Sequence, residues 1–189
     1  MTPLGWTIIA IVVLLLISVI FSYNRFVRQR TLVDESWGGI DVELSRRHDL
    51  IPNLVETVQG YATHEREVLE LLVRAREDAT AHRDDRPGQR EGFEDQVTRA
   101  LREVLARVEA YPDLKASTNF LSLQRELTLT EDRIAASRRF YNGNVRAYNT
   151  RVRTFPSNLI AATFRFRARD FFELDDPAKA SVPGVDPAG

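Results

Sequence analysis

The sequence predicts an all-α protein, in which an N-terminal transmembrane helix is followed by an antiparallel up-and-down bundle of long helices. Three observations support this fold class. The chain opens with a long apolar stretch that carries no charge. Beyond it, apolar residues recur at spacings of three, four and seven, which is typical of one face of a helix. No segment shows the strict alternation of a half-buried strand, so we expect helices packed on helices.

The N-terminal segment, residues 1–24, is predicted to be a membrane anchor. It contains no charged side chain, and Trp6 to Phe21 are almost purely apolar. With its flanks the stretch reaches about 20 residues, enough for a helix to cross a bilayer. No basic residue precedes it and no Ala-x-Ala follows, which favours an uncleaved anchor over a signal peptide. Arg25, Arg28 and Arg30 follow directly, so the positive-inside rule places the rest of the chain in the cytoplasm.

A helix is predicted to continue out of the membrane, because two series of residues repeat every seven positions. The first series contains Phe26, Val33 and Ile40. The second contains Arg30, Trp37 and Leu44. Gly38–Gly39 interrupts the pattern, and two glycines inside a helix cost roughly 2 kcal/mol relative to alanine. We therefore expect a bend or a close backbone approach at this position.

The stretch "RRHDLIPNLVETVQGYATHE", Arg46 to Glu65, is predicted to start the second helix. Asp49 is a good candidate for the N-cap, and Pro52 would then fall in the first turn, where a missing N–H costs nothing. His48 would lie at the turn beside the cap. His64 is sixteen residues away, which turns it to nearly the opposite side of a helix, towards solvent or an interface. The two histidines therefore do not predict a metal or hydrolytic site.

Two further helices complete the predicted bundle. One runs from about Phe93 to Tyr111 and stops at Pro112, and a long one runs from about Ser117 to Thr154. The apolar seam of the long helix repeats every seven residues, which predicts supercoiled packing. That seam consists of Phe120, Leu127, Ile134, Tyr141 and Tyr148.

Several polar residues lie on or beside the predicted seams and form a candidate polar layer. They are Arg30, Glu131, Arg138, Asn142 and Asn149. Charges at such positions cost stability unless they are paired, and polar seam residues can set the register of helices. We expect a structural layer in which Glu131 pairs with Arg30 or Arg138. The alternative is a pocket in this layer that binds a small molecule or a lipid.

The segment "RFRARDFFEL" interleaves aromatic residues with arginines. As a helix it could lie on an anionic membrane surface, which makes its charged and aromatic residues candidates for membrane or partner contact. These candidates are Arg165, Arg167, Phe171 and Phe172. The favoured alternative is a short cap that turns its phenylalanines into the bundle. We expect the bundle to cover residues 25–173, and residues 174–189, rich in Pro, to form a disordered tail.

The blocks "VDESWGGIDVELSRRHDLIPNLVETVQGYATHE" and "YPDLKASTNFLSLQRELTLTEDRIAASRRFYNGNVRAYNTRVRTFPSNLIA", with "YNRFV" and "FFE", resemble the LemA family of bacterial membrane proteins. The resemblance implies a single-pass protein of the bacterial plasma membrane with a helical cytoplasmic domain. It brings no catalytic residues, and one relative's connection with magnetosome membranes points to membrane organisation. Two features depart from the family pattern, namely Gly38–Gly39 and a tail without the usual final aromatic residue.

Taken together, these features favour a scaffold or adaptor without chemistry of its own, whose partners are membrane proteins or copies of itself. The alternative is a sensor that binds its ligand in the polar layer. An enzyme would need a nucleophile, a base and oxyanion donors that converge, and no coherent set is found. The sequence contains no Cys, which excludes disulfides and thiol catalysis. A net charge of −1 offers no case for nucleic acid, and we expect no cofactor and no metal.

Overall fold

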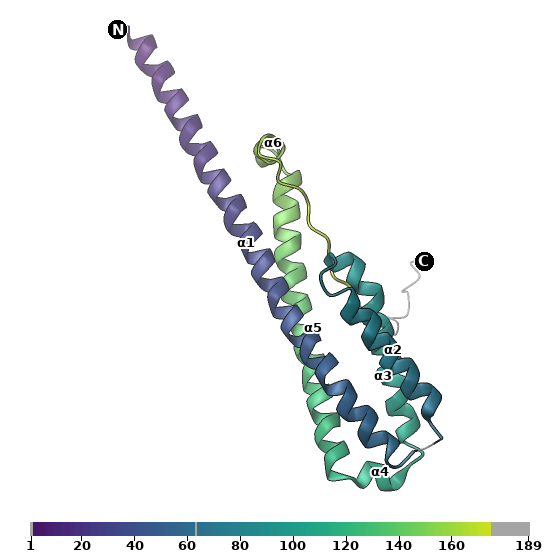
Figure 1. The fold of residues 1–189 in the computed structure, drawn as a ribbon. Helices are drawn as coiled ribbons and strands as arrows, with labels where there is room; N and C mark the ends of the chain where they lie inside the picture. The colour runs from purple at the N-terminus through teal and green to yellow at the C-terminus, as the bar shows by residue number, and fades with distance from the viewer. Residues whose placement is uncertain (1, 63, 175–189) are drawn as a thin grey trace, which may run out of the picture. The chain divides into compact units, whose positions relative to one another are not determined.

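The computed structural model describes residues 2–62 and 64–174, and within these ranges every regular element is a helix (Figure 1). The predicted all-α class is therefore confirmed. The helices are α1 (Pro3–Gln59), α2 (Arg66–Ala81), α3 (Pro87–Val108), α4 (Pro112–Ala116), α5 (Thr118–Arg153) and α6 (Ser157–Thr163). The chain divides into two compact units, and the division falls inside α1 and inside α5. Unit 1 comprises residues 1–47 and 128–171, and unit 2 comprises residues 48–127 and 172–189.

Unit 1 is built on α1 and α5, which are antiparallel here. Phe26 contacts Tyr148, and Trp37 contacts Tyr141, so positions rise along α1 as they fall along α5. The core of this unit contains the first predicted series of α1, all of it buried, whereas in the second series Leu44 is buried, Trp37 is half-buried and Arg30 is exposed. The core includes Phe26, Val33, Ile40, Ile134, Tyr141 and Tyr148. The spacing places them on one face, and burial of each large apolar side chain stabilises the pair by about 1.5–3 kcal/mol.

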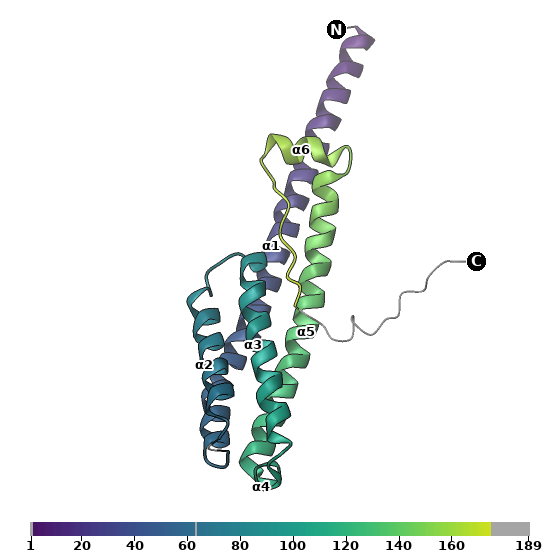
Figure 2. The same ribbon diagram turned by 90° about the vertical axis from the view of Figure 1, so that its right-hand side faces the viewer.

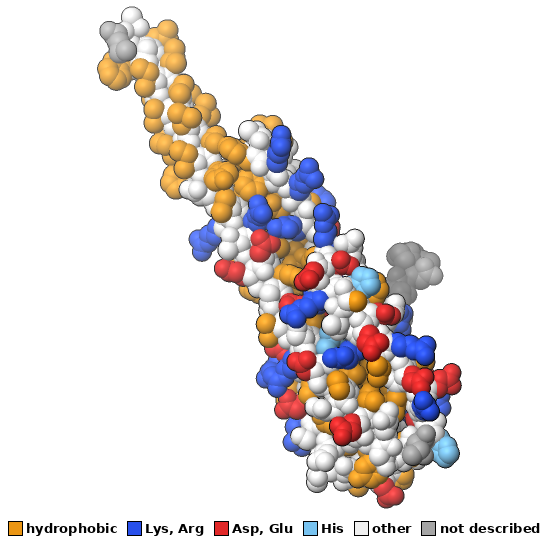
Figure 3. All heavy atoms as spheres, viewed as in Figure 1, with side chains coloured by type: hydrophobic (Ala, Val, Ile, Leu, Met, Phe, Trp, Pro, Cys, Tyr) orange, Lys and Arg blue, Asp and Glu red, His pale blue; other side chains and the backbone are white. Residues whose placement is uncertain are grey.

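The N-terminal part of α1 carries large apolar side chains that are exposed on every side of the helix. Figure 3 shows this stretch as an apolar rod that emerges from unit 1. Leu14 and Phe21, for example, expose 66% and 71% of their surface. Among the described residues, α1 is the helix that is long and apolar enough to cross a membrane.

Unit 2 packs α2, α3 and α4 with the adjoining turns of α1 and α5 around one apolar core. That core includes Ile51, Leu54, Leu69, Leu72, Leu101, Val104 and Leu114. Figure 2 shows α2 and α3 side by side. Pro87 and Pro112 begin α3 and α4, where a proline loses no helical hydrogen bond.

The predicted start of a helix at Asp49 is wrong. α1 runs without a break from Pro3 to Gln59, so Asp49 caps nothing and Pro52 lies inside the helix. An internal proline cannot bond the carbonyl four residues earlier, which here belongs to His48. The Arg76 side chain supplies the missing donor, because its Nε lies 2.8 Å from the His48 carbonyl oxygen. The chain turns only after Gln59, and exposed His64 lies in that turn.

Gly38–Gly39 does not interrupt α1. A Cβ atom added at either glycine would meet no other atom within 4 Å. The expected close backbone approach is therefore wrong, and the helix retains two glycines that the packing does not require. Within the described residues of the predicted tail, Leu174 is buried. The rest of the tail lies outside the described residues, and the bundle limits of 25–173 remain a prediction.

Candidate functional site

The segment after α6 has no regular secondary structure, so "RFRARDFFEL" does not form the amphipathic helix that was considered for membrane contact. We call residues 166–171 the strap. Asn149 holds it to α5 with two hydrogen bonds of 2.8 Å, one donated to the Arg169 carbonyl and one accepted from the Arg169 N–H. Tyr141 donates its hydroxyl to the Asp170 carbonyl at 2.8 Å. Side chains thus satisfy strap backbone groups that a helix would have bonded internally.

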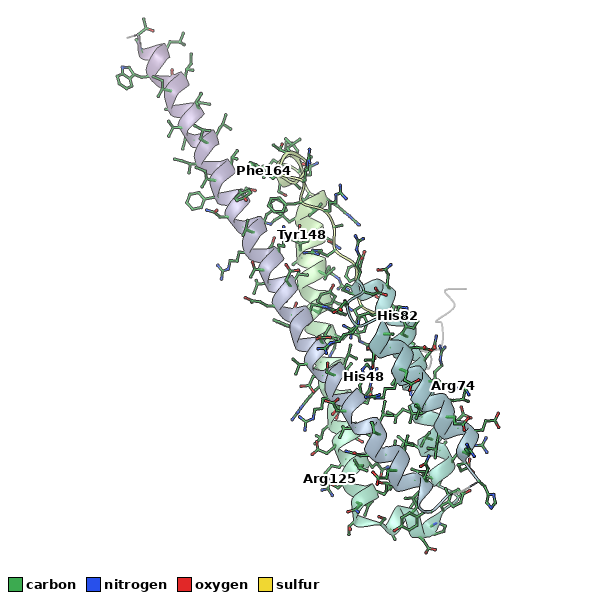
Figure 4. The ribbon with its side chains drawn as sticks, in the orientation of Figure 1. His48, Arg74, His82, Arg125, Tyr148 and Phe164 are labelled. Carbon is green, nitrogen blue, oxygen red and sulfur yellow. The ribbon has the colours of Figure 1, made fainter. Side chains whose placement is uncertain are left out.

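Aromatic rings fix the other end of the strap to α1. The Phe166 ring stacks on Phe26 at 4.8 Å and lies 5.7 Å from Tyr23. The Phe164 ring meets Tyr23 edge-on at 4.9 Å (Figure 4). Arg169 reaches α1 as well, with its Nη2 2.9 Å from an oxygen of Asp34. In unit 1 the strap therefore packs against both α1 and α5.

The predicted contact residues of this segment are separated by the fold. Phe172 is fully buried in unit 2, where it cannot meet a membrane. Phe171 exposes 37% of its surface, and Arg165 and Arg167 are exposed. Arg165 has a φ of 58°, the left-handed conformation, which turns the chain from α6 into the strap. Phe172 thus faces inward, and Phe171 does not.

The end of unit 1 that carries α6 exposes large apolar side chains that were not among the predicted contact residues. We call Phe155, Leu159 and Phe164 the α6 tip. They expose 74%, 59% and 46% of their surface. The opposite side of α6 packs inward through buried Ala161. A short amphipathic turn is difficult to find in a sequence, because seven residues give fewer than two full turns of periodicity.

Arginines lie around the α6 tip and along the part of α1 that follows the apolar stretch (Figure 3). The Arg151 guanidinium carbon lies 5.7 Å from the centre of the Phe26 ring. Partial burial and the nearby positive charge of Arg25 both lower the pKa of Arg151. Two cations are therefore close together at this end of unit 1, which favours the approach of an anion.

Within the predicted polar layer, Glu131 forms an ion pair, but its partner is Arg47 and not Arg30. Glu131 Oε1 lies 3.0 Å from Arg47 Nη1, and Arg47 is fully buried. The expected partner Arg30 is exposed and lies 3.9 Å from Asp34. Arg47 follows the buried series at Ile40 and Leu44 by spacings of seven and three, a signal that the sequence reading missed. Arg138 and Asn142 are half-buried.

Unit 2 contains a second buried polar cluster that the sequence reading missed. His48 Nε2 lies 3.1 Å from one oxygen of Glu94, and Arg90 Nη2 lies 3.3 Å from the other. Arg90 also donates to the Arg83 carbonyl at 2.8 Å. His48 thus lies inside unit 2 and not at a helix start, and its charged neighbours share a face with Val97 on α3. In the described part of the chain, no cluster of His, Asp and Glu side chains is arranged to hold a metal ion.

An open groove of about 300 Å³ lies in unit 2. Apolar Ile51, Val55 and Val73 line it, with Glu56 and Arg76 also on its wall. This groove does not involve Glu131, Arg138 or Asn142. The residues proposed for a ligand pocket in the polar layer therefore do not line it.

Comparison with known proteins gives the following relationships. A sequence model of the LemA family matches residues 36–186. A protein named LemA from Metamycoplasma hominis is 27% identical over 140 residues, which are 73% of this chain and 63% of that protein. Magnetosome proteins MamQ 1 and MamQ 2 of Paramagnetospirillum magneticum are each 31% identical over 74 residues, or 39% of this chain and 27% of each relative. The matched region thus spans less than two thirds of the length of these relatives.

Proposed function

Because the chain belongs to the LemA family, we propose that it is a membrane-anchored helical scaffold or adaptor without chemistry of its own. One observation carries the proposal. The exposed apolar stretch and the buried seam from Phe26 to Leu44 belong to one uninterrupted helix, α1. A segment anchored in the bilayer would therefore hold the helix pair of unit 1 directly at the membrane, without a flexible linker.

The charges next to the apolar stretch support one orientation of the protein. Arg25, Arg28 and Arg30 follow it, and no Lys or Arg precedes it. The positive-inside rule then leaves both units in the cytoplasm, on the inner face of a bacterial plasma membrane. The proposal is therefore a single-pass protein with its helical part in the cytoplasm.

The proposed partners are membrane proteins or further copies of the chain. Unit 1 exposes large apolar side chains on both of its long helices, including Val42 at 64% and Phe140 at 63%. Aromatic side chains such as that of Phe140 are enriched at protein interfaces. Two relatives are named as magnetosome proteins, and the match covers 27% of each.

Site-specific photocrosslinking in cells tests the proposal. A crosslinking amino acid placed at Val42 or Phe140 of the full-length protein should capture one reproducible membrane protein, or the chain itself, identified by mass spectrometry. The same probe at exposed, charged Asp132 on α5 is the matched control and should capture much less. A monomer without repeatable neighbours at Val42 and Phe140 would refute the scaffold.

A further inference from the structure

We propose that the α6 tip and the arginines around it form a binding site for anionic phospholipid headgroups. The tip would enter the headgroup region of the membrane that α1 crosses, while the arginines bind lipid phosphates. This inference rests on the proposed membrane anchor. It adds a second, lipid-specific contact to a protein otherwise held by one helix. The arginines concerned are Arg25, Arg28, Arg151, Arg153, Arg165 and Arg167.

The depth of α1 in the membrane sets the depth of the tip. Counted from Leu4, a 20-residue helical span reaches Tyr23 and is about 30 Å long, which matches the hydrocarbon thickness of a bilayer. Tyr23 thus falls where tyrosines concentrate, at the membrane–water interface. The Phe164 ring packs against Tyr23 at 4.9 Å. When α1 crosses the membrane, the α6 tip therefore lies at the level of the headgroups.

The tip exposes its apolar side chains to solvent. Phe155, Leu159 and Phe164 form an apolar surface at one end of unit 1, and Phe155 is 74% exposed. The inner side of α6 is already packed through Ala161, so the tip is not a displaced piece of the core. Removing such a surface from water is favourable, and lipid at the headgroup boundary can cover it.

The sequence around the tip is positively charged. Residues 1–33 and 133–169 contain no acidic side chain, and the sequence after α5 adds Arg165 and Arg167 next to the tip. Arg169 is the exception among these arginines, because it pairs with Asp34 at 2.9 Å. Arg151 lies 5.7 Å from the ring of Phe26, which follows Arg25 in α1, so these two cations lie close to the end of the apolar span. A guanidinium group can donate two parallel hydrogen bonds to the oxygens of a lipid phosphate. Anionic lipids are concentrated in the cytoplasmic leaflet of the membrane.

Lipid fits this site better than nucleic acid. Nucleic acid would use the arginines but would leave the apolar side chains of the tip in water. A lipid surface uses both, because phosphate groups and acyl chains lie within a few ångströms of each other. The site therefore selects a bilayer that contains anionic phospholipid.

The chain contains no Cys, so a single introduced Cys can carry an environment-sensitive fluorophore. We would label Leu159→Cys in the full-length protein and reconstitute it in vesicles that contain a quencher on the lipid, with or without phosphatidylglycerol. Val13→Cys, 46% exposed in the apolar span, reports membrane insertion. Leu129→Cys, 44% exposed on α5 and roughly 33 Å along the helix from Arg151, is the aqueous control.

Lipid quenching of the probe at Val13 and Leu159, but not at Leu129, is expected with phosphatidylglycerol. Quenching at Val13 alone would overturn the lipid site and leave the anchor intact. The absence of quenching at Val13 would overturn the proposed anchor itself. Equal quenching at Leu159 in phosphatidylcholine vesicles would overturn the recognition of anionic lipid.

A charge-matched pair of variants separates a local site from net charge. In the double variant Arg165→Gln and Arg167→Gln, fewer molecules should have the tip in contact with lipid. The ratio of molecules with a lipid-bound tip to molecules with a tip in water should fall about fivefold for each arginine removed. Arg133→Gln with Arg139→Gln removes the same charge from exposed positions further along α5 and should leave the ratio nearly unchanged. Equal losses in the two double variants would refute a specific site at the tip.

Discussion

The hydrogen bond from Arg76 to the His48 carbonyl should be necessary because Pro52 is inside α1. Pro52 lacks the N–H that would bond this carbonyl, and Arg76 Nε lies 2.8 Å from its oxygen. Arg76→Met keeps an unbranched side chain of similar helix propensity and removes the donor. Leaving this partly buried carbonyl without its bond should cost about 2 kcal/mol, within the range of 1–3 kcal/mol for an unpaired polar group.

Pro52→Ala restores a backbone N–H that can bond the His48 carbonyl in the ordinary helical way. In this background, we expect Arg76→Met to cost only about 0.5 kcal/mol, since the carbonyl no longer depends on the side chain. The double-mutant cycle should therefore give a coupling of about 1.5 kcal/mol. Arg74→Met is the control on the same helix, because Arg74 is exposed and pairs with Glu70 at 3.7 Å, and its loss should cost less than about 0.5 kcal/mol.

The assay is urea unfolding of the full-length protein in one fixed detergent, followed by helical circular dichroism. Hydrogen exchange of peptides from residues 48–59 gives a local readout, which should rise in Arg76→Met and return towards the original rate in the double variant. A coupling below about 0.3 kcal/mol would show that the two residues act independently, and the reasoning about the missing N–H would then be wrong.

Three further predictions concern unit 1. Glu131→Gln removes the charged partner of fully buried Arg47 and should lower stability by about 2–3 kcal/mol in thermal or urea unfolding, whereas an unchanged midpoint would contradict the ion pair. Burial raises the pKa of Tyr141 to about 12, above the unfolded value near 10. Between these two pKa values the native state keeps a proton that the unfolded state releases. The contribution of Tyr141 to the free energy of unfolding is therefore complete below pH 10 and is lost as the pH rises to 12. Unfolding of Tyr141→Phe should depend less on pH in that window, and an identical slope would refute the assignment. Alanine at Gly38–Gly39 should stabilise the protein by about 1–2 kcal/mol, because both glycines are helical and a Cβ meets no neighbour there, and a loss of stability would show a role for the glycines that the packing does not reveal.

The apolar span and the seven-residue seams could be predicted because each depends on neighbours within the same helix. The seam through Phe26, Val33 and Ile40 can be predicted from the 3.6-residue period of the helix alone. The prediction does not require knowing which helix packs against it. Tyr141 and Tyr148 follow the same rule on α5. For these residues the local pattern and the buried core agree.

The candidate sites were less predictable because their partners are far apart in sequence. Glu131 was expected to need a cation, but its partner Arg47 is 84 residues away. The same holds for His48, whose position inside unit 2 depends on Glu94, 46 residues further on. A spacing rule along one helix cannot identify a partner on another.

By itself, the sequence determined an uncharged apolar span, helices with buried seams and an arginine-rich border after the span. These follow from side-chain chemistry and helical period alone. The tertiary structure decided where the helices end and which polar groups meet. Pro52 stays helical because Arg76 bonds the freed carbonyl, and residues 166–171 stay extended because Asn149 and Tyr141 bond their backbone. In each case a distant side chain outweighs the local preference, because a buried backbone group must have a partner.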